Sequence, residues 1–427
     1  MRKTFYSHSF GCRVNQAEQE ELDKRLVEFG FTKDQGDPSF YIINSCSVTH
    51  KAEREVKQLM YQIRRKYPQT KLIVTGCAAT NWINQQMKLP DGDMLIDNSN
   101  KEFIASLIEK ESSTKQTAPV PASVTVNDKY LNSKRVILKI QDGCQRFCTY
   151  CIVPYLRGTP RSIATQTIVE TISAYEKEGI QEVIAAAINT EAYGYDTGES
   201  FLGLISAILS ETSIPRLSFG SIHPWSITPE FLKWYETEAQ NPRFVDFFHI
   251  PLQSGSNKIL QLMKRGYTRE EFLEKLNQIA IIQPFAFIGT DVIVGFLGEE
   301  EKDFQDTYKF LEQTPISRFH VFRYSERKNT AASYMKKRVN EPTSAEKIKR
   351  ARALAELGAK KYQKFLDSHV GQRFATLILE KKEGNSQQGL LENQIPVLVD
   401  TTHDRTGEIV PVQILECKNG SLFGRIV

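Results

Sequence analysis

The chain has 427 residues, of which 40% are hydrophobic and 25% are charged, and its formal net charge is +4. This composition is typical of folded globular proteins and excludes a disordered or collagen-like chain. At roughly 150 residues per domain, the length predicts two or three domains. No stretch of about 18 residues lacks a charge, and polar residues follow Arg2 and Lys3 where a signal peptide needs an apolar core. We therefore expect a cytoplasmic protein that does not cross a membrane.

Residues 1–111 alternate between short apolar strands and amphipathic helices, which predicts a flavodoxin-like or Rossmann-like parallel sheet. The expected strands are Thr4–Phe10, Tyr41–Asn44, Lys71–Thr75 and Met94–Ile96, and the expected helices are Gln16–Phe29, Ala52–Tyr67 and Glu102–Glu111. Cys12, Cys46 and Cys77 follow three of these strands. Because parallel strands end at one edge of a sheet, we expect the three cysteines to converge there.

A segment rich in Ser, Thr, Pro and Asn, residues 112–134, is expected to be a linker, and the alternation resumes after it. The expected strands of residues 135–369 are Arg135–Ile140, Glu182–Ile188, Arg216–Phe219, Val245–His249, Phe287–Val294 and Phe319–Phe322. Expected helices include Gln166–Glu178, Arg269–Gln283 and Ala345–His369. Six such units predict a (β/α) TIM barrel, either complete or partial.

Residues 370–427 change to short strands separated by Gly and Asn turns, which predicts a small antiparallel β-barrel as a third domain. The expected strands are Arg373–Glu380, Ile395–Val399, Ile409–Leu415 and Leu422–Val427. The fold class is therefore α/β with a C-terminal all-β module.

Seven cysteines are the most informative residues of the chain: Cys12, Cys46, Cys77, Cys144, Cys148, Cys151 and Cys417. Without an export signal, clustered cysteines indicate metal binding or catalysis rather than disulfides. The spacing Cys144-x-x-x-Cys148-x-x-Cys151 supplies three thiolates, as for an iron–sulfur cluster with one iron left free, whereas a structural zinc ion takes four protein ligands. The loop follows the first predicted barrel strand, on the face where barrel enzymes hold their active sites.

Several longer motifs occur in a fixed order along the chain: Phe10–Gln16, Ile43–Thr49, Val74–Cys77, Lys139–Gly158, His249–Ser256, Asp291–Glu299 and His320–Phe322. In these motifs the chain resembles the radical S-adenosylmethionine (SAM) methylthiotransferases over nearly its whole length. The resemblance implies that Cys144, Cys148 and Cys151 hold the [4Fe–4S] cluster that binds SAM. It also implies that Cys12, Cys46 and Cys77 hold an auxiliary [4Fe–4S] cluster that carries sulfur, although buried cysteines also occur as plain core residues. No catalytic residue is assigned beyond these ligands.

The resemblance and the predicted strand ends point to ten further candidates for SAM binding. They are Tyr150, Arg157, Asn189, Ser221, His223, Gln253, Ser254, Asp291, Gly295 and Glu299. Tyr150 is expected near the adenine of SAM, and Arg157 is expected to pair with the SAM carboxylate or a phosphate. Ordinary packing or loop roles remain open for each of them. One departure from the family pattern, Ala185-Ala186-Ala187 in place of Leu-Thr-Gly, bears on the affinity for SAM.

The family divides by substrate, and the motifs around Cys12, Cys46 and Cys144 most resemble the group that modifies N6-threonylcarbamoyladenosine in tRNA. The resemblance implies 2-methylthiolation of adenosine 37 beside the anticodon, a flavodoxin or ferredoxin as electron donor, and a monomer. The alternatives are the enzymes for isopentenyladenosine in tRNA and for an aspartate of ribosomal protein S12. A non-catalytic iron–sulfur protein that binds RNA as a redox sensor is an alternative of another class.

The charge distribution favours an RNA contact in the middle of the chain. Residues 323–364 contain 13 basic and 4 acidic residues, and residues 51–71 contain 7 basic and 2 acidic residues. Basic surfaces of this kind neutralise RNA phosphates. The C-terminal module resembles the TRAM domain, an RNA-binding barrel, yet residues 370–427 contain 6 basic and 7 acidic residues. We therefore expect the basic helix before the barrel to contribute more to RNA binding than the barrel does.

Overall fold

The computed structural model describes residues 3–87, 92–113, 134–238, 241–384, 386–401 and 403–427. The N-terminal sheet is parallel, in the order β2-β1-β3-β4-β5. Its strands are β1 Thr4–Ser9, β2 Thr32–Lys33, β3 Phe40–Ser45, β4 Lys71–Thr75 and β5 Met94–Leu95. Its helices are α1 Arg13–Glu28, α2 His50–Lys66, α3 Gly76–Asn84 and α4 Ile104–Ser113, with the 3-10 turn η1 Lys101–Phe103 before α4. The predicted parallel sheet is confirmed.

Alternating side chains place helices on both faces of this sheet. Ile42 and Ile73 pack with α1 and α4 on one face, while Ile43 and Val74 pack with α2 and α3 on the other. The sequence did not predict α3, because its first turns contain small and polar residues without an apolar stripe. The predicted linker lies mostly outside the described residues, so the domain boundaries at 111, 134 and 369 stay predictions.

The central part is an open barrel made of two sheets, in the orders β7-β6-β8-β9 and β10-β11-β12. The strands are β6 Arg135–Asp142, β7 Arg161–Ser162, β8 Glu182–Ala187, β9 Arg216–Phe219, β10 Phe247–His249, β11 Phe287–Val294 and β12 Arg318–Arg323. Apart from the short antiparallel β7, the paired strands are parallel. An isolated parallel β-bridge between Leu217 of β9 and Phe244, shortly before β10, connects the edges of the two sheets. The predicted partial barrel is confirmed.

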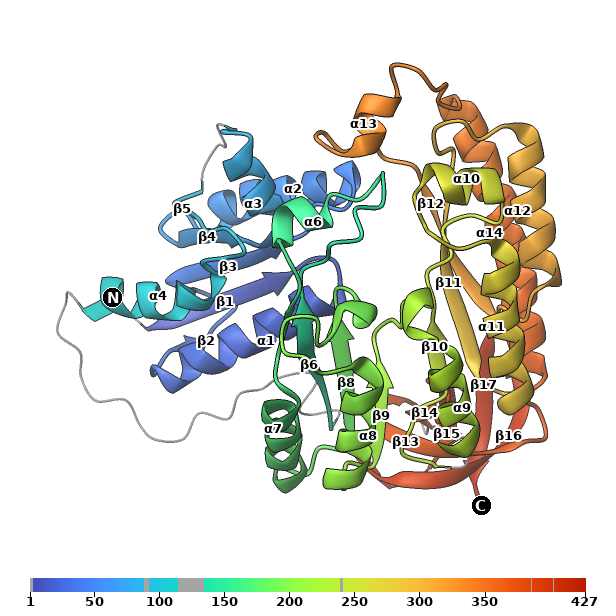
Figure 1. Ribbon diagram of the computed structural model, residues 1–427. Helices are drawn as coiled ribbons and strands as arrows, with labels where there is room; N and C mark the ends of the chain where they lie inside the picture. The colour runs from blue at the N-terminus through green and yellow to red at the C-terminus, as the bar shows by residue number, and fades with distance from the viewer. Residues whose placement is uncertain (1–2, 88–91, 114–133, 239–240, 385, 402) are drawn as a thin grey trace.

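The helices that cover the outer side of the two core sheets are α7 Thr165–Lys177, α8 Phe201–Glu211, α9 Pro229–Glu238, α11 Arg269–Ile282, α12 Glu301–Gln313 and α14 Ser344–Asp367 (Figure 1). Three short helices lie at the other end of the core from the C-terminal barrel: α6 Val153–Arg157, α10 Asn257–Leu262 and α13 Ala331–Met335. The 3-10 turns η2 Thr190–Ala192 and η3 Pro224–Ser226 follow β8 and β9. The long helix α14 begins with a capping box, in which Thr343 and Glu346 satisfy each other's backbone amides.

Helix α1 of the N-terminal domain packs on the inner face of the first core sheet. Val14 and Ala17 of α1 lie against Ile137 of β6 and against Ile184 and Ala186 of β8. Ala186, which stands where the family pattern has a threonine, thus packs against α1. Its neighbour Ala185 points into the main core on the other face, so the small side chains fit the helix that this chain places there.

The C-terminal barrel closes in the order β13-β14-β15-β17-β16. Its strands are β13 Arg373–Glu383, β14 Ser386–Leu391, β15 Pro396–Asp400, β16 Ile409–Lys418 and β17 Ser421–Ile426. The sequence did not predict β14, because Ser-Gln-Gln-Gly lacks the alternation of a half-buried strand. The pairing is antiparallel except between β15 and β17, which run parallel and close the barrel.

The barrel docks at the amino ends of the core strands, on the side of the core opposite to α13 (Figure 1). Arg216 at the start of β9 donates to the carbonyl oxygens of Leu390 and Leu391, at 2.9 and 2.7 Å. Arg135 at the start of β6 donates to Gln394 at 2.7 Å. Burial opposes the charge of Glu182 between these arginines, but their attraction holds its pKa at about 2. These ion pairs and hydrogen bonds fix the barrel far from the carboxyl ends of the same strands.

Asp246 at this junction is expected to make the stability of the protein depend on pH. Burial raises its pKa from 3.8 to about 7, although the Tyr235 hydroxyl donates to it at 2.7 Å. Between these two pH values the folded protein keeps a proton that the unfolded chain has lost, so stability falls as pH rises through this range. The loss amounts to at most about 4 kcal/mol.

Asp246→Asn is expected to flatten this dependence, because the amide oxygen still accepts from Tyr235 and carries no charge. Chemical denaturation at about pH 5 and about pH 8 measures it. Asp306→Asn, at a partly exposed carboxylate on α12, serves as the control and is expected to keep the wild-type slope. An equal slope in all three proteins would contradict the assignment to Asp246.

Among the described helices, none combines the length and the apolar character that crossing a membrane requires.

Candidate functional site

The three N-terminal cysteines lie at the carboxyl ends of the adjacent strands β1, β3 and β4. Cys12 is the N-cap of α1, Cys46 directly follows β3, and Cys77 lies in the first turn of α3. All of them are free thiols, as are the other four cysteines. The parallel topology thus brings three residues that are far apart in sequence to one edge of the sheet.

Two glycines allow the loops at this edge to approach one another. Gly11 has a φ of +92°, and a Cβ atom there would lie 2.8 Å from the sulfur of Cys46. Gly76 has a φ of +91°, and a Cβ atom there would lie 2.4 Å from the carbonyl oxygen of Ser45. The amide of Asn15 ties the loops together by donating to the carbonyl of Ser45 at 3.1 Å. These positions require glycine both for their backbone conformation and for space.

The three thiols interact electrostatically with one another. Burial, together with the neighbouring Cys77 and Cys12 sulfurs, raises the pKa of Cys46 to about 12. Cys12 lies at the surface, but the protein atoms packed around it limit its hydration and, together with Cys77, raise its pKa, against the opposing charge of Arg157. A metal or cluster binds thiolates, so binding here would displace protons and favour a nearby cation.

The second triplet lies in the loop between β6 and α6. Gly143 before it has a φ of +76°, and a Cβ atom there would lie 2.0 Å from the carbonyl oxygen of Thr159. The Cys144 amide donates to the carbonyl of Gly158 at 3.1 Å, which closes the loop at its base. Burial and the Cys148 sulfur raise the pKa of Cys151 to about 12. The guanidinium of Arg265 lies 3.4 Å from the sulfur of Cys148 and supplies a buried positive charge.

Among the described residues, no three His, Cys, Asp or Glu side chains converge on the position of a single metal ion. Ligands of a four-iron cluster bind different iron atoms and therefore stand farther apart than the ligands of one ion. Two groups of three neighbouring thiols, each beside a buried arginine, suit such clusters better than they suit zinc, which takes four ligands.

Helix α6 joins the two triplets. Ile152 and Leu156 pack against Cys77 of the N-terminal domain. The amide of Asn98 lies 3.7 Å from the Cys77 sulfur and donates to the Leu156 carbonyl at 3.0 Å. The element that follows the core cysteine loop therefore also forms part of the wall around Cys77.

Arg157 at the end of α6 has several partners within the protein. Its guanidinium is buried and donates to Asp142 at 2.7 Å, to Glu18 at 3.0 Å and to Asn15. Burial opposes the charge of Glu18, but Arg157 and two lysines, Lys101 and Lys139, hold its pKa well below the usual range. Within the protein, the guanidinium of Arg157 is thus paired with the carboxylates of Asp142 and Glu18.

Two predicted residues, Ser221 after β9 and Asp291 in β11, are connected by hydrogen bonds through His249 at the end of β10. Ser221 bonds to Nδ1 of His249 at 2.8 Å, and Nε2 of His249 bonds to Asp291 at 3.2 Å. His223 lies next to these residues, where burial and Arg265 lower its pKa to about 3, so it is neutral. Asn189 caps the following 3-10 turn by accepting from the Glu191 amide at 3.3 Å. These residues lie on the side of the core that carries the cysteine loop.

The other predicted SAM contacts have partners within the protein. The hydroxyls of Ser254 and Thr307 lie 3.3 Å apart, and Gln253, with a φ of +80°, pairs by its backbone with β11. Gly295 leaves room for Lys347, and Glu299 accepts from Arg350 at 2.7 Å, so both hold α14 in place. Tyr150 packs edge-on against Phe296 and lies 3.4 Å from Arg265.

Sequence reasoning missed a stack of cations and aromatic rings beside the core cysteines. Two guanidinium groups lie over the ring of Trp225, Arg146 at 4.3 Å and Arg265 at 4.6 Å from the ring centre. Such contacts are attractive because the ring face is electronegative. In the sequence, the position of Trp225 shortly after a predicted strand was the one sign of this stack. Arg146 and Arg265 are far from Trp225 in the sequence, so their contact with it could not be predicted.

Comparison with known proteins gives three matching family models: the uncharacterized protein family UPF0004 over residues 4–97, the radical SAM superfamily over 138–311, and the TRAM domain over 367–427. A threonylcarbamoyladenosine tRNA methylthiotransferase of Aquifex aeolicus is 34% identical over 95% of this chain and 98% of its own length. The Bacillus subtilis protein of the same description is 31% identical over 98% and 96%. A tRNA-2-methylthio-N(6)-dimethylallyladenosine synthase of Sulfurovum is 30% identical over 100% of both chains.

Among solved structures, the radical SAM methyltransferase TsrM from Kitasatospora setae matches with a TM-score of 0.52 and 10% identity, over 76% of this chain and 72% of that chain. At this identity the similarity concerns the fold.

Proposed function

This chain belongs to the methylthiotransferase family of radical SAM enzymes, and from that premise we propose that it methylthiolates N6-threonylcarbamoyladenosine in tRNA. The observation that carries the proposal is that α6 joins the two cysteine triplets, since it begins two residues after Cys151 and packs against Cys77. In this proposal, one short helix connects the site where the radical would form to the site that would hold sulfur. The relatives with the threonylcarbamoyl description are 31% to 34% identical to the chain.

The segment after Cys46 belongs to one of the motifs that most resemble the threonylcarbamoyladenosine group, and it contacts the core domain. Ser47 lies just before α2 and His50 is its first residue, and both bond to Arg327 from the loop before α13, at 2.8 and 3.2 Å. Glu53 of the same helix also pairs with Arg327. This segment therefore lies where the N-terminal domain meets the core, and its partner Arg327 shortly precedes α13, whose Ala332 amide donates to Thr149 of the core cysteine loop. The dimethylallyl and S12 enzymes are the alternatives within the family.

Both [4Fe–4S] clusters and SAM belong to this proposal. Cys144, Cys148 and Cys151 would hold the cluster that binds SAM, and Cys12, Cys46 and Cys77 would hold the auxiliary cluster. When bound, these groups supply the radical, the sulfur and the methyl group. Arg265 and Arg157 place buried positive charge beside the two thiolate sets, and Tyr150, Asn189, Ser221, His223 and Asp291 are the residues we retain for SAM.

The surroundings of the reaction are also part of the proposal: adenosine 37 as the target, a flavodoxin or ferredoxin as the electron donor, a monomeric protein and a cytoplasmic location. An anticodon loop presents its bases unpaired, so the target base can leave the stack at low cost.

Anaerobic reconstitution followed by reaction with tRNA from a strain that lacks the modification tests the function. We expect about eight iron atoms per chain, 5′-deoxyadenosine formation and the 2-methylthio derivative of threonylcarbamoyladenosine by nucleoside mass spectrometry. Product on isopentenyladenosine alone would move the chain to the other tRNA group. Iron near four per chain without SAM cleavage would favour the redox sensor.

A further inference from the structure

Two exposed aromatic rings lie on the outer side of the core cysteine loop. Phe147, between Cys144 and Cys148, is 49% exposed, and Tyr155 on α6 is 47% exposed. Their ring centres are 5.7 Å apart at an interplanar angle of 74°. Phe147 has a φ of +47°, a conformation that bulky residues rarely adopt and that is concentrated at functional sites. The loop thus directs cysteines inward and holds an aromatic ring outward.

A third exposed ring comes from the element that docks on the same loop. The Ala332 amide in α13 donates to the carbonyl of Thr149 at 2.8 Å, between Cys148 and Cys151. Tyr334 of α13 is 63% exposed, which makes it the most exposed tyrosine among the described residues. The hydroxyl of Thr149 donates to the Leu262 carbonyl at 2.8 Å, which places the chain before Lys264 against the loop as well.

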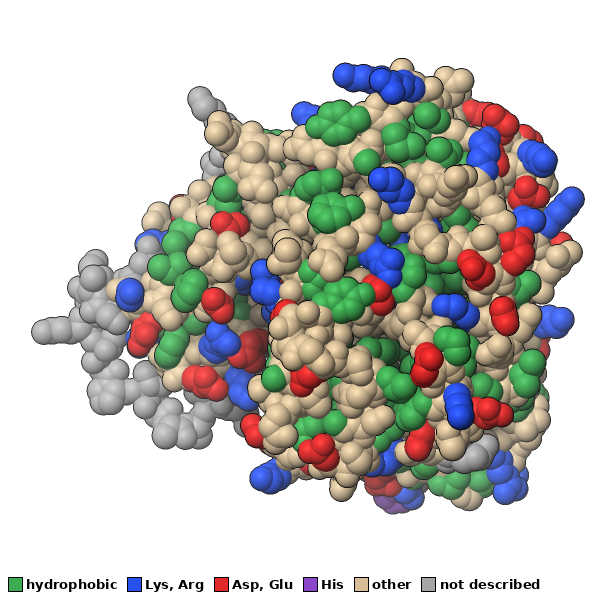
Figure 2. Space-filling model, viewed as in Figure 1, with side chains coloured by type: hydrophobic (Ala, Val, Ile, Leu, Met, Phe, Trp, Pro, Cys, Tyr) green, Lys and Arg blue, Asp and Glu red, His purple; other side chains and the backbone are tan. Residues whose placement is uncertain are grey.

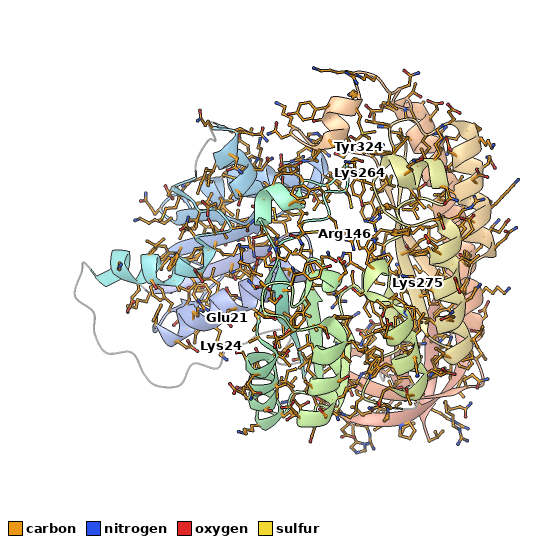
Figure 3. All side chains as sticks on the ribbon, in the orientation of Figure 1. Glu21, Lys24, Arg146, Lys264, Lys275 and Tyr324 are labelled. Atoms are coloured by element: carbon orange, nitrogen blue, oxygen red, sulfur yellow. The ribbon has the colours of Figure 1, made fainter. Side chains whose placement is uncertain are left out.

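Three exposed basic residues follow the segments that dock on the core cysteine loop. Lys264, Lys337 and Arg338 are exposed and form no ion pair within the described part of the chain. The nearby carboxylates are already engaged, since Glu326 and Glu341 pair with Lys336 and Glu191 pairs with Arg146. Figure 2 shows basic side chains at the top of the molecule with hydrophobic groups exposed below them, and Figure 3 places Arg146 and Lys264 in the region between α6 and α10.

We propose that Phe147, Tyr155 and Tyr334 form a stacking surface for unpaired bases of the tRNA loop, with Lys264, Lys337 and Arg338 binding its phosphates. This inference rests on the proposed function. Exposed rings next to a positively charged groove are the features by which proteins bind single-stranded nucleic acid, because every base has a face that stacks. The surface adjoins the core cysteines, where the target base has to arrive. The C-terminal barrel lies at the opposite end of the core strands and carries no net positive charge.

Equilibrium binding of tRNA to the reconstituted full-length protein tests the surface. Phe147→Ala and Tyr334→Ala are each expected to weaken binding by about 5- to 100-fold. Phe147→Trp, which keeps a stacking ring, is expected to bind as the wild type does. Lys337→Ala is expected to lower the slope of affinity against salt by about one. Phe103→Ala, at a ring that is 52% exposed on η1, is the matched control and is expected to leave affinity unchanged.

Iron content and SAM cleavage are measured without tRNA, to distinguish a loss of tRNA binding from damage to the cluster loop. Tyr334→Ala is a second variant whose substitution lies outside that loop. Unchanged tRNA affinity in both alanine variants would overturn the stacking surface, even if the wild type modifies tRNA. A slower reaction with a flavodoxin at unchanged tRNA affinity would overturn it too and assign the surface to the electron donor. A wild type that binds tRNA by these rings and forms no methylthio product would instead refute the proposed function.

Discussion

Arg157→Met is expected to lower the free energy of unfolding by about 3 to 5 kcal/mol. The guanidinium is buried and donates to Asp142 and Glu18, and the methionine would leave these two carboxylates without their shared partner. Removal of one member of a buried ion pair costs this much because the remaining charge stays desolvated. Denaturant unfolding under anaerobic conditions, before cluster reconstitution, measures the change.

Arg161 offers a matched control for this prediction. It approaches the same carboxylate, Asp142, at 3.6 Å, but its side chain is 54% exposed. We expect Arg161→Met to cost less than about 1 kcal/mol, because water screens the pair. Equal losses in the two variants would mean that burial of Arg157 is not the source of its contribution.

Cys77→Ala is expected to abolish the methylthio product while SAM cleavage continues. The substitution removes one of three thiols from the N-terminal site and leaves Cys144, Cys148 and Cys151 in place. With only two ligands left, that site is expected to lose its cluster, so iron should fall from about eight to about four per chain. Iron analysis, 5′-deoxyadenosine and the modified nucleoside are measured on the same preparation.

Cys417→Ala is the control for this loss. Cys417 lies in β16 of the C-terminal barrel, where Gln363 donates to its sulfur at 3.2 Å. This variant is expected to keep both the full iron content and the product. Full product from Cys77→Ala would contradict an auxiliary cluster on Cys12, Cys46 and Cys77.

Local patterns predicted the parts of the fold whose signal lies within a few residues. Strand β4 and strand β11 have the predicted bounds, because each is an apolar run with clear ends. Helix α3 and strand β14 were missed, because neither shows apolar periodicity. Their positions come from neighbouring elements, which bury Trp82 in one case and pair with the backbone in the other.

The residues of the candidate site likewise fall into those that local sequence patterns predicted and those whose partners are distant in the sequence. The three cysteines of the core loop lie within eight residues, so spacing alone brought them together, and the strand alternation predicted that Cys12, Cys46 and Cys77 share an edge. The partners of Arg157 were beyond reach, since Asn15 is 142 residues away and belongs to another domain. Gly295 and Glu299 were expected at the cofactor. Their contacts come from Lys347 and Arg350 of α14, about 50 residues later in the sequence.

By itself, the sequence determined the alternation of strands and helices, the cysteine spacing and the uneven charge along the chain. Those properties depend on residues that are close in the sequence. The regular repeats of helix and strand fix how the side chains of such residues are arranged. Only the tertiary structure decided that α1 packs on the inner face of the first core sheet, that α6 joins the two cysteine sites, and that the barrel docks at the far end of the core strands. Close packing decides these contacts, because a buried side chain meets atoms from whichever distant segment fills the remaining space.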